Sequence, residues 1–257
     1  KRRFHDLPKD VHPLQDAGLD TIDELLFQRA YLPYAVAAEV IEQNQRSLED
    51  QLIALKFAHP GQNVCPTVLG VLTVGKSPTD WVPGAYVQFL RIDGMNLTDP
   101  IRNQKELRGP LPGFLEELDD LLKNNIQSSA DITSGSIETR VSDYPIVALQ
   151  QIVRNAILHR SYKNTNAPVK LYWFNDRVEI HNPGGPYGQV TKENFGQSGV
   201  NDYRNPNLAA VMKELGYVQR FGCGIMLARD EMRKNGNPPP EFQIEDAYVA
   251  VILRRHP

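Results

Sequence analysis

The sequence contains little cysteine, and its few residues with metal-binding side chains lack a metal-binding pattern. Only two cysteines occur in 257 residues, Cys65 and Cys223. Two thiols this far apart are neither a zinc cluster nor a disulfide framework, and a reducing, cytoplasmic compartment is the simplest expectation. The six histidines show no i, i+4 pair and no HExxH spacing, so a metalloenzyme is disfavoured.

Long apolar runs and an excess of positive charge are also missing. No run approaches the roughly 18 apolar residues of a membrane span, and no signal peptide opens the chain, so no membrane partner is expected. The net charge is −3 and the pI is about 6.1, which confines any contact with DNA or RNA to a local surface. The chain begins with Lys1, as a fragment of a longer protein would.

What is present is an ordinary globular composition, with 41% hydrophobic and 23% charged residues. A chain of this length exceeds what one compact core usually holds, so two domains are expected. The sequence of residues 1–20 predicts an extended arm. Apolar spacing and turn residues predict helices at 20–30 and 34–58, a buried strand or the end of a helix at 66–75, a strand at 85–92 and a helix at 111–126.

The polar, glycine-containing segment 128–136 marks the expected division into domains 1–130 and 131–257. Beyond it the patterns predict a helix at 144–160, strands at 168–175 and 176–182, a glycine-rich loop at 183–199, helices at 206–215 and 225–235, and a strand at 247–254. Helices mixed with mostly antiparallel strands indicate an α+β sandwich rather than a doubly wound parallel sheet.

The helix at 144–160 has the most informative pattern. Asp143 suits its N-cap, and Pro145 suits the first turn, where a missing N–H costs nothing. Gln151, Asn155 and His159 recur at i, i+4 and i+8, nearly opposite the apolar face. Three uncharged polar groups on one stripe suit a ligand better than a solvated face. An ordinary surface or amide-network stripe is the alternative interpretation.

Two glycine segments favour the ligand interpretation. One predicted strand ends in Asn182-Pro-Gly184-Gly185, and Gly222-Cys-Gly224 opens a predicted helix. Glycine lets the backbone approach a ligand closely, and a helix N-terminus offers free N–H groups to phosphate oxygens. Each segment alone is weak evidence, whereas the polar stripe and both glycine segments, in this order, are more specific.

These motifs carry a family resemblance over residues 140–255. They resemble the RecG-related C-terminal, GHKL-like (histidine kinase and gyrase-type) ATPase family in Gln150–Tyr162, Val178–Gly185, Arg204–Pro206, Arg220–Ile225 and Pro238–Phe242. The resemblance implies a two-layer α/β sandwich with a mixed, mostly antiparallel sheet in the C-terminal domain. Residues 66–126 resemble the latter part of a Schlafen AlbA-type domain, which with the helical arm would make 1–130 a partial domain of that type.

The resemblance also implies site roles, with ATP and Mg²⁺ as cofactors. Asn155 would bind Mg²⁺ through its amide oxygen, and Asn182 stands where such proteins carry the aspartate that accepts from the adenine amino group. Gly184 and Gly185 would pack under the base, and Gly222 and Gly224 would flank the phosphates. His159 and Arg160, at the helix end, would either reach phosphate or cap carbonyls.

One departure affects the expected chemistry. Gln151 occupies the position where hydrolysing members of this class carry the glutamate that activates water. An amide cannot take a proton, and loss of a general base costs about 10²–10⁴ in rate. The sequence therefore predicts a possible ATPase in which hydrolysis is slow or absent.

The functional expectation is an ATP-binding regulatory protein coupled to nucleic-acid binding, similar to a transcriptional regulator. A non-catalytic scaffold with a decayed ATP pocket and a Schlafen-like nuclease are the alternatives. DNA or RNA and a second copy of the chain remain open as partners.

Overall fold

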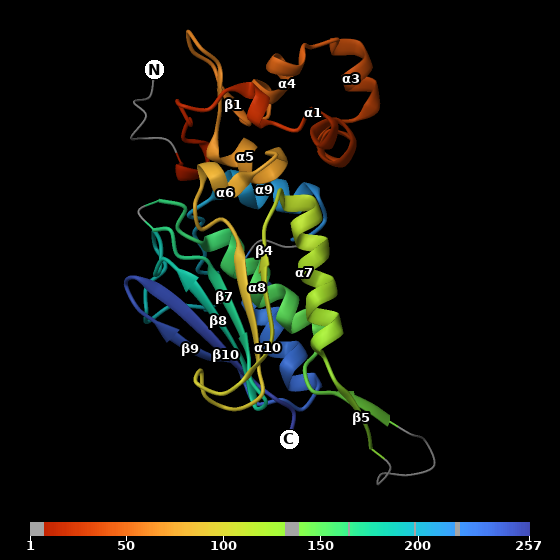
Figure 1. Cartoon of the computed structure of the whole chain (residues 1–257), viewed down its shortest axis with the longest axis vertical. Coiled ribbons are helices and arrows are strands. Elements are labelled where there is room, and N and C mark those ends of the chain that lie inside the picture. The colour runs from red at the N-terminus through yellow and green to blue at the C-terminus, as the bar shows by residue number, and fades with distance from the viewer. Residues whose placement is uncertain (1–7, 132–138, 164, 198, 219–221) are drawn as a thin grey trace.

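A six-stranded sheet forms the centre of the computed structural model, which describes residues 8–131, 139–163, 165–197, 199–218 and 222–257 (Figure 1). The strand order is β4-β3-β7-β8-β10-β9. The strands are β3 (Val87–Ile92), β4 (Ile101–Leu107), β7 (Val169–Trp173), β8 (Arg177–Pro183), β9 (Glu241–Ile244) and β10 (Tyr248–Arg254). Strands β3 and β7 pair in parallel and the other neighbours antiparallel. The expected mixed, mostly antiparallel sheet is confirmed.

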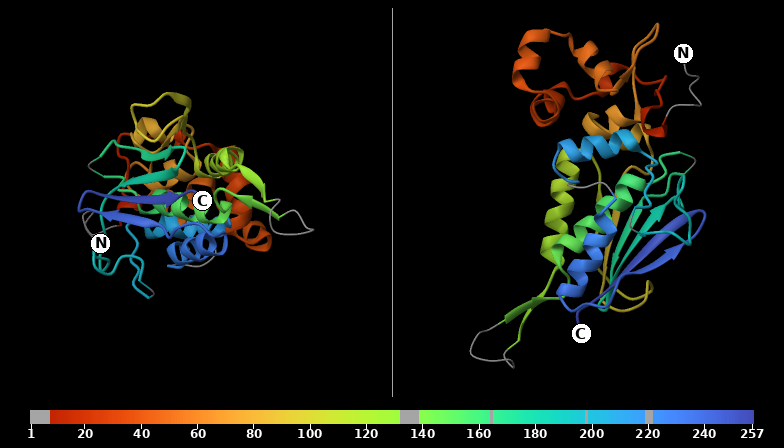
Figure 2. Two further views of the ribbon diagram at one scale, coloured as in Figure 1. Left: turned by 90° about the horizontal axis from the view of Figure 1, so that it is seen from below. Right: turned by 180° about the vertical axis from the view of Figure 1, so that it is seen from behind.

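Helices pack against one face of this sheet, which makes the two-layer α+β arrangement (Figure 2). The layer contains α7 (Leu111–Asn125), α8 (Ile146–His159) and α10 (Gly224–Lys234), and α5 (Val68–Val74), α6 (Pro78–Trp81) and α9 (Pro206–Glu214) lie beyond one end of it (Figure 1). Alternate residues of β8 are buried, as expected for a strand with one covered face. The buried apolar face of α8, with Leu149, Val153 and Ala156, belongs to the same core as Ile180 of β8.

The N-terminal part forms short helical segments at one end of the molecule (Figure 1). These are η2 (Lys9–Val11), η3 (Leu19–Thr21), α1 (Glu24–Leu26), the π-helical turn η4 (Phe27–Tyr31), α2 (Leu32–Ala35), α3 (Ala38–Asn44) and α4 (Leu48–Ala54), followed by strands β1 (Ala58–His59) and β2 (Cys65–Pro66). The continuous helix expected at 34–58 is therefore wrong. Gln45 ends α3 in the left-handed region, and the Ser47 hydroxyl caps α4 by accepting the N–H of Asp50.

The apolar run at 66–75 is helix α5, so the strand interpretation is wrong. The Thr67 hydroxyl accepts the N–H of Gly70 and starts the helix. All seven residues of α5 are buried, and complete burial removes the periodicity that separates a helix from a strand. A Cβ at Gly70 would overlap the backbone of Phe57, so glycine permits this close packing.

Helix α8 lies where its pattern predicts, but its first turn differs. The helix begins at Ile146 with Pro145 as its N-cap residue, so Asp143 is not the cap. The Asp143 carboxylate accepts the N–H of Gln127 at 2.9 Å, and its backbone carbonyl accepts from Asn237 and His256. Asp143 therefore connects the segments around α8 instead of starting the helix.

The sheet takes strands from both sides of residue 130. Strands β3 and β4 precede it, whereas β7 to β10 follow it, and β3 pairs directly with β7. The polar segment itself contributes a hairpin of β5 (Ser128–Asp131) and β6 (Thr139–Ser142), and residues 132–138 lie outside the described chain. The division into two domains thus stays a prediction. No helix among the described residues has the length and apolar character needed to span a bilayer.

Candidate functional site

One cleft brings together the polar stripe and both glycine segments. It lies between α8, the helix-covered face of the sheet, the loop after β8 and the start of α10, and it contains about 1240 Å³ of atom-free space, including the part open to solvent. Seven of the predicted residues line this cleft: Gln151, Asn155, His159, Asn182, Gly185, Gly222 and Gly224.

Asn182 is the most buried polar group of the cleft. It is 6% exposed and points from β8 toward the helix layer, on the same strand face as Ile180. Its Oδ1 atom is buried and has no hydrogen-bond partner among the described residues. Leaving a buried acceptor unpaired costs about 1–3 kcal/mol, so a donor on a bound molecule would be favoured at this atom.

The two glycines after Asn182 differ in position. Gly184 does not line the cleft: its φ is 108°, its N–H donates to Ala247, and a Cβ there would meet Ser161 and the Arg204 guanidinium. Gly185 does line the cleft. A Cβ on Gly185 would overlap the carbonyl oxygens of the turn between β9 and β10, so only glycine fits.

The outer wall of the cleft comes from the loop between β8 and α9, whose side chains the sequence patterns did not single out as ligand contacts. Arg204 donates to the Gly185 carbonyl at 2.9 Å and lies 4.9 Å from the centroid of the Tyr187 ring. Burial lowers the pKa of Arg204, and its Nε atom is buried without a partner among the described residues. In the sequence, only the Arg204-Asn-Pro206 motif of the family resemblance pointed to this part of the cleft wall.

His159 faces the cleft as a neutral ring. It stacks on Tyr203 with ring centroids 5.5 Å apart and an interplanar angle of 23°. Burial, reinforced by the nearby Arg204 charge and partly offset by Asp202, lowers the pKa of His159 to about 4. At pH 7 the ring therefore carries no charge, so it can hydrogen-bond to a ligand but cannot neutralise a phosphate.

Arg160 turns away from the cleft and caps carbonyls. It is 2% exposed, and its guanidinium donates to Ala167 at 2.8 and 3.2 Å and to Ser161 at 3.0 Å. The Asn205 amide covers the last α8 carbonyls by donating to Leu158 and to Arg160. Of the two roles expected for Arg160, capping is the one its contacts support.

The second glycine segment places the N-terminus of α10 beside the amide stripe. Gly222 has a φ of 75°, and its N–H donates to the Tyr203 hydroxyl. Within the described part of the chain no side chain caps the start of α10, whose Gly224 and Ile225 line the cleft. Its first N–H groups are thus available to an anion. The motif residues Gln219, Arg220 and Phe221 lie outside the described part of the chain.

Arg154 is a second cation of the cleft wall. Its Nη2 atom lies 2.5 Å from the Asp119 carboxylate of α7, and its Nη1 atom donates to the Tyr217 carbonyl. Both side chains of the pair are at most 15% exposed. Arg154 is therefore engaged with α7 and contributes little free positive charge to the cleft.

The cleft side chains could hold a metal ion only together with oxygen ligands from a bound molecule. No group of three or more His, Cys, Asp or Glu side chains within the described ranges could hold a metal ion. Asn155 offers one neutral amide oxygen at the cleft. Mg²⁺ commonly takes few protein ligands and completes its octahedron with phosphate oxygens and water, so Asn155 fits a nucleotide-borne Mg²⁺ rather than a resident ion.

Comparisons with known proteins agree with this geometry. Residues 166–253 match a family described as "Putative ATP-dependent DNA helicase recG C-terminal". That match supports the RecG-related, ATPase-like part of the expected resemblance and indicates ATP binding. No curated protein matches the chain.

A solved structure shares the fold over nearly the whole chain. The DIP2311 protein from Corynebacterium diphtheriae superposes with a TM-score of 0.68 at 19% sequence identity, over 94% of this chain and 46% of that one. This chain therefore spans less than half of the length of that protein. At this identity the likeness extends to the fold alone.

Proposed function

We propose that this protein binds a purine nucleotide, ATP with Mg²⁺, in the cleft between α8, β8 and α10, and turns it over slowly or not at all. The observation that carries the proposal is the unpaired, buried Oδ1 atom of Asn182 in a cleft that Asn155 and the start of α10 also line. An amino group on the ligand's base would pair with this oxygen, and phosphates would lie toward the free N–H groups of α10.

The remaining cleft residues fit these positions. Asn155 would hold Mg²⁺ against the phosphates, and Arg204, whose Nε atom is unpaired, supplies a donor next to Gly185. The bound Mg²⁺ would supply charge neutralisation for the phosphates. Gln151 lines the same cleft, but its amide cannot accept a proton from water, so binding without rapid hydrolysis is expected.

The test is direct binding of Mg·ATP to the purified chain by calorimetry. Asn182→Ala and Asn155→Ala should each weaken binding about tenfold or more, since each removes one polar contact to the ligand. Asn63→Ala, an exposed asparagine outside the cleft, is the matched control and should leave the affinity unchanged. If Mg·ATP shows no saturable binding to the wild type, this proposal is wrong and the scaffold alternative is favoured.

A regulatory role coupled to DNA or RNA is a further part of the proposal and rests on the family resemblance of the sequence. Salt-dependent binding of nucleic acid that changes on addition of Mg·ATP would support the coupling. Cleavage of DNA or RNA with Mn²⁺ would favour the Schlafen-like nuclease alternative instead.

A further inference from the structure

A second polar pocket lies at the opposite end of the sheet from the cleft. Arg91 pairs in register with Trp173 of β7, which in turn pairs with Val178, whereas Asn182 stands at the other end of β8. The pocket contains about 660 Å³ of atom-free space, part of it open solvent. Its lining among the residues that the structure describes contains no acidic side chain and consists of Arg91, Arg102, Asn103, Asn124, Asn125 and Gln127.

Arg91 is a buried cation that forms no ion pair within the described part of the chain. The residue is 8% exposed, and its Nη1 atom makes one long hydrogen bond, 3.4 Å, to the Phe174 carbonyl. Its guanidinium also lies 5.7 Å from the centroid of the Trp173 ring. Among the described residues it has no carboxylate within ion-pair distance. Buried charges in proteins are normally paired, because an unpaired one loses its hydration without replacement.

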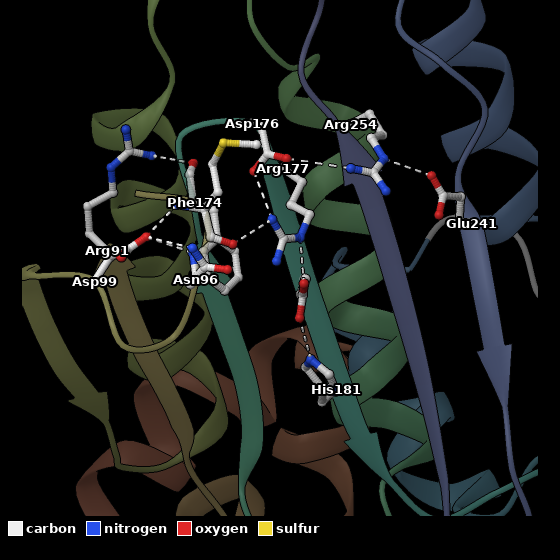
Figure 3. A network of polar contacts seen from close by, with 11 residues as sticks. Arg91, Asn96, Asp99, Phe174, Asp176, Arg177, His181, Glu241 and Arg254 are labelled. Carbon is white, nitrogen blue, oxygen red and sulfur yellow. Dashed lines mark hydrogen bonds and ion pairs between the residues drawn. The ribbon is translucent and has the colours of Figure 1, made fainter. Parts of the chain in front are cut away.

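Two arginines at the same end of the sheet show the usual arrangement (Figure 3). Arg177 pairs with Asp176 at 2.9 Å and Glu179 at 2.6 Å, and Arg254 pairs with Glu241 at 2.8 Å. Both side chains are more exposed than Arg91, at 18% and 41%. In Figure 3 the Arg91 guanidinium reaches only the Phe174 carbonyl. Of these three arginines, Arg91 is the most buried, and it is the one that forms no ion pair with a described carboxylate.

The surrounding charges leave the pocket positive. Burial lowers the pKa of Arg91, as does the nearby Arg102, while Asp143 and Asp93 act in the opposite direction. The Asp143 carboxylate is already engaged by the N–H of Gln127, and Asp93 lies 3.9 Å from Arg102. Guanidinium remains protonated at any physiological pH, so two positive side chains face this pocket.

The amides around the arginines complete an anion-binding surface. Asn103, Asn124 and Gln127, which carry side-chain amides, line the pocket. The C-terminal carbonyls of α7 would repel an anion, but Leu121 and Lys123 already accept from Asn125 and Ile126. Planar guanidinium groups match phosphate oxygens in geometry as well as in charge.

We propose that the pocket between the β3–β4 edge and the C-terminal end of α7 is a phosphate-binding site, in which Arg91 and Arg102 hold the oxyanion and neighbouring amides donate to it. The site is separate from the nucleotide cleft and does not depend on the function proposed for that cleft.

The test is titration of the full chain with inorganic phosphate by calorimetry. Saturable binding is expected. Arg91→Gln and Arg102→Gln should each weaken it about tenfold, the effect of losing one charge-assisted contact. Arg254→Gln is the matched control and should change the dissociation constant less than about twofold. Unchanged affinity in both pocket variants, or no saturable binding of any phosphate ligand, overturns the proposal.

A second measurement separates binding from folding. Without phosphate, Arg91→Gln should not lower Tm, because it removes an unpaired charge, whereas Arg177→Gln should lower it. With phosphate, Tm should rise for the wild type and not for Arg91→Gln. A rise in Tm with phosphate that is as large in Arg91→Gln as in the wild type overturns the proposal.

A short oligothymidylate, titrated in parallel, identifies the source of the phosphate. Binding of inorganic phosphate indicates a free or terminal phosphate group. Binding of the oligonucleotide alone, lost in Arg91→Gln, also supports the site and assigns it a phosphodiester.

Discussion

Gly224 lies so close to Gln151 that a Cβ added to the glycine would stand 3.2 Å from the Oε1 atom of Gln151. The two residues are 73 positions apart in sequence (224 − 151), and each belongs to a different predicted motif. Their contact joins the amide stripe of α8 to the start of α10 and closes one side of the cleft.

Introducing a carboxylate at residue 151 should accelerate hydrolysis. Gln151→Glu places a group that can take a proton in the cleft, and steady-state phosphate release should rise about tenfold or more, the lower part of the range for general-base catalysis. Gln150→Glu adds the same charge on α8 at a residue that does not line the cleft and should not change the rate. Equal rates in the two variants would contradict the role of residue 151.

The amide of Asn182 should accept both purines. Its oxygen can pair with the adenine amino group, and its Nδ2 atom can donate to the guanine 6-oxygen after rotation of the amide, whereas a carboxylate only accepts. Dissociation constants for ATP and GTP should therefore lie within about threefold in the wild type and separate to about tenfold, in favour of ATP, in Asn182→Asp. If the wild type binds ATP and rejects GTP, this prediction fails while nucleotide binding stands.

His159 should make stability depend on pH in mildly acid solution. Its pKa falls to about 4 in the folded protein against about 6.5 in an unfolded chain, so unfolding takes up a proton between these values. The neutral ring contributes fully above pH 6.5, and the contribution declines as pH falls toward 4. At pH 5 the loss is at most about 2 kcal/mol. Urea denaturation at pH 7 and pH 5 should show a smaller loss in His159→Gln.

The Asp119–Arg154 pair should stabilise the packing of α7 on α8. Asp119→Ala leaves a largely buried guanidinium without its carboxylate and should lower the free energy of unfolding by about 1–3 kcal/mol. Asp120→Ala removes an exposed carboxylate 3.5 Å from Lys123 and should change it by less than about 0.5 kcal/mol. Similar denaturation midpoints for both variants would show that burial of the first pair has no energetic consequence.

Adding a methyl group should have opposite effects at two glycines. Gly185→Ala forces a Cβ against the carbonyls of Glu245 and Asp246 and should cost about 1–3 kcal/mol of stability. Gly113 lies in α7 with nothing within 4 Å of an added Cβ, so Gly113→Ala should stabilise by up to about 1 kcal/mol through helix propensity. The midpoints of urea denaturation of the two variants are compared with that of the wild type. A shift of the same sign in both variants would contradict the packing around Gly185.

Elements with one buried face were predictable from the sequence. The α8 stripe follows from the helical period, so Gln151, Asn155 and His159 could be assigned to one face before any coordinates. Asn182 was singled out by the Asn-Pro-Gly-Gly segment and the family resemblance instead. Strand β4 was missed because six of its seven residues are exposed and show no apolar alternation. Helix α5 was misassigned for the opposite reason, since every residue in it is buried.

The sequence by itself determined the order of the motifs, the amphipathic faces and the presence of an amide at residue 151, because these depend only on local periodicity and residue chemistry. Only the tertiary structure decided that Arg160 caps carbonyls while its neighbour His159 enters the cleft, that the loop before α9 supplies the Arg204 wall, and that Arg91 is buried without a carboxylate. Such outcomes depend on contacts between residues distant in the chain, and no local pattern encodes which of these side chains finds a partner.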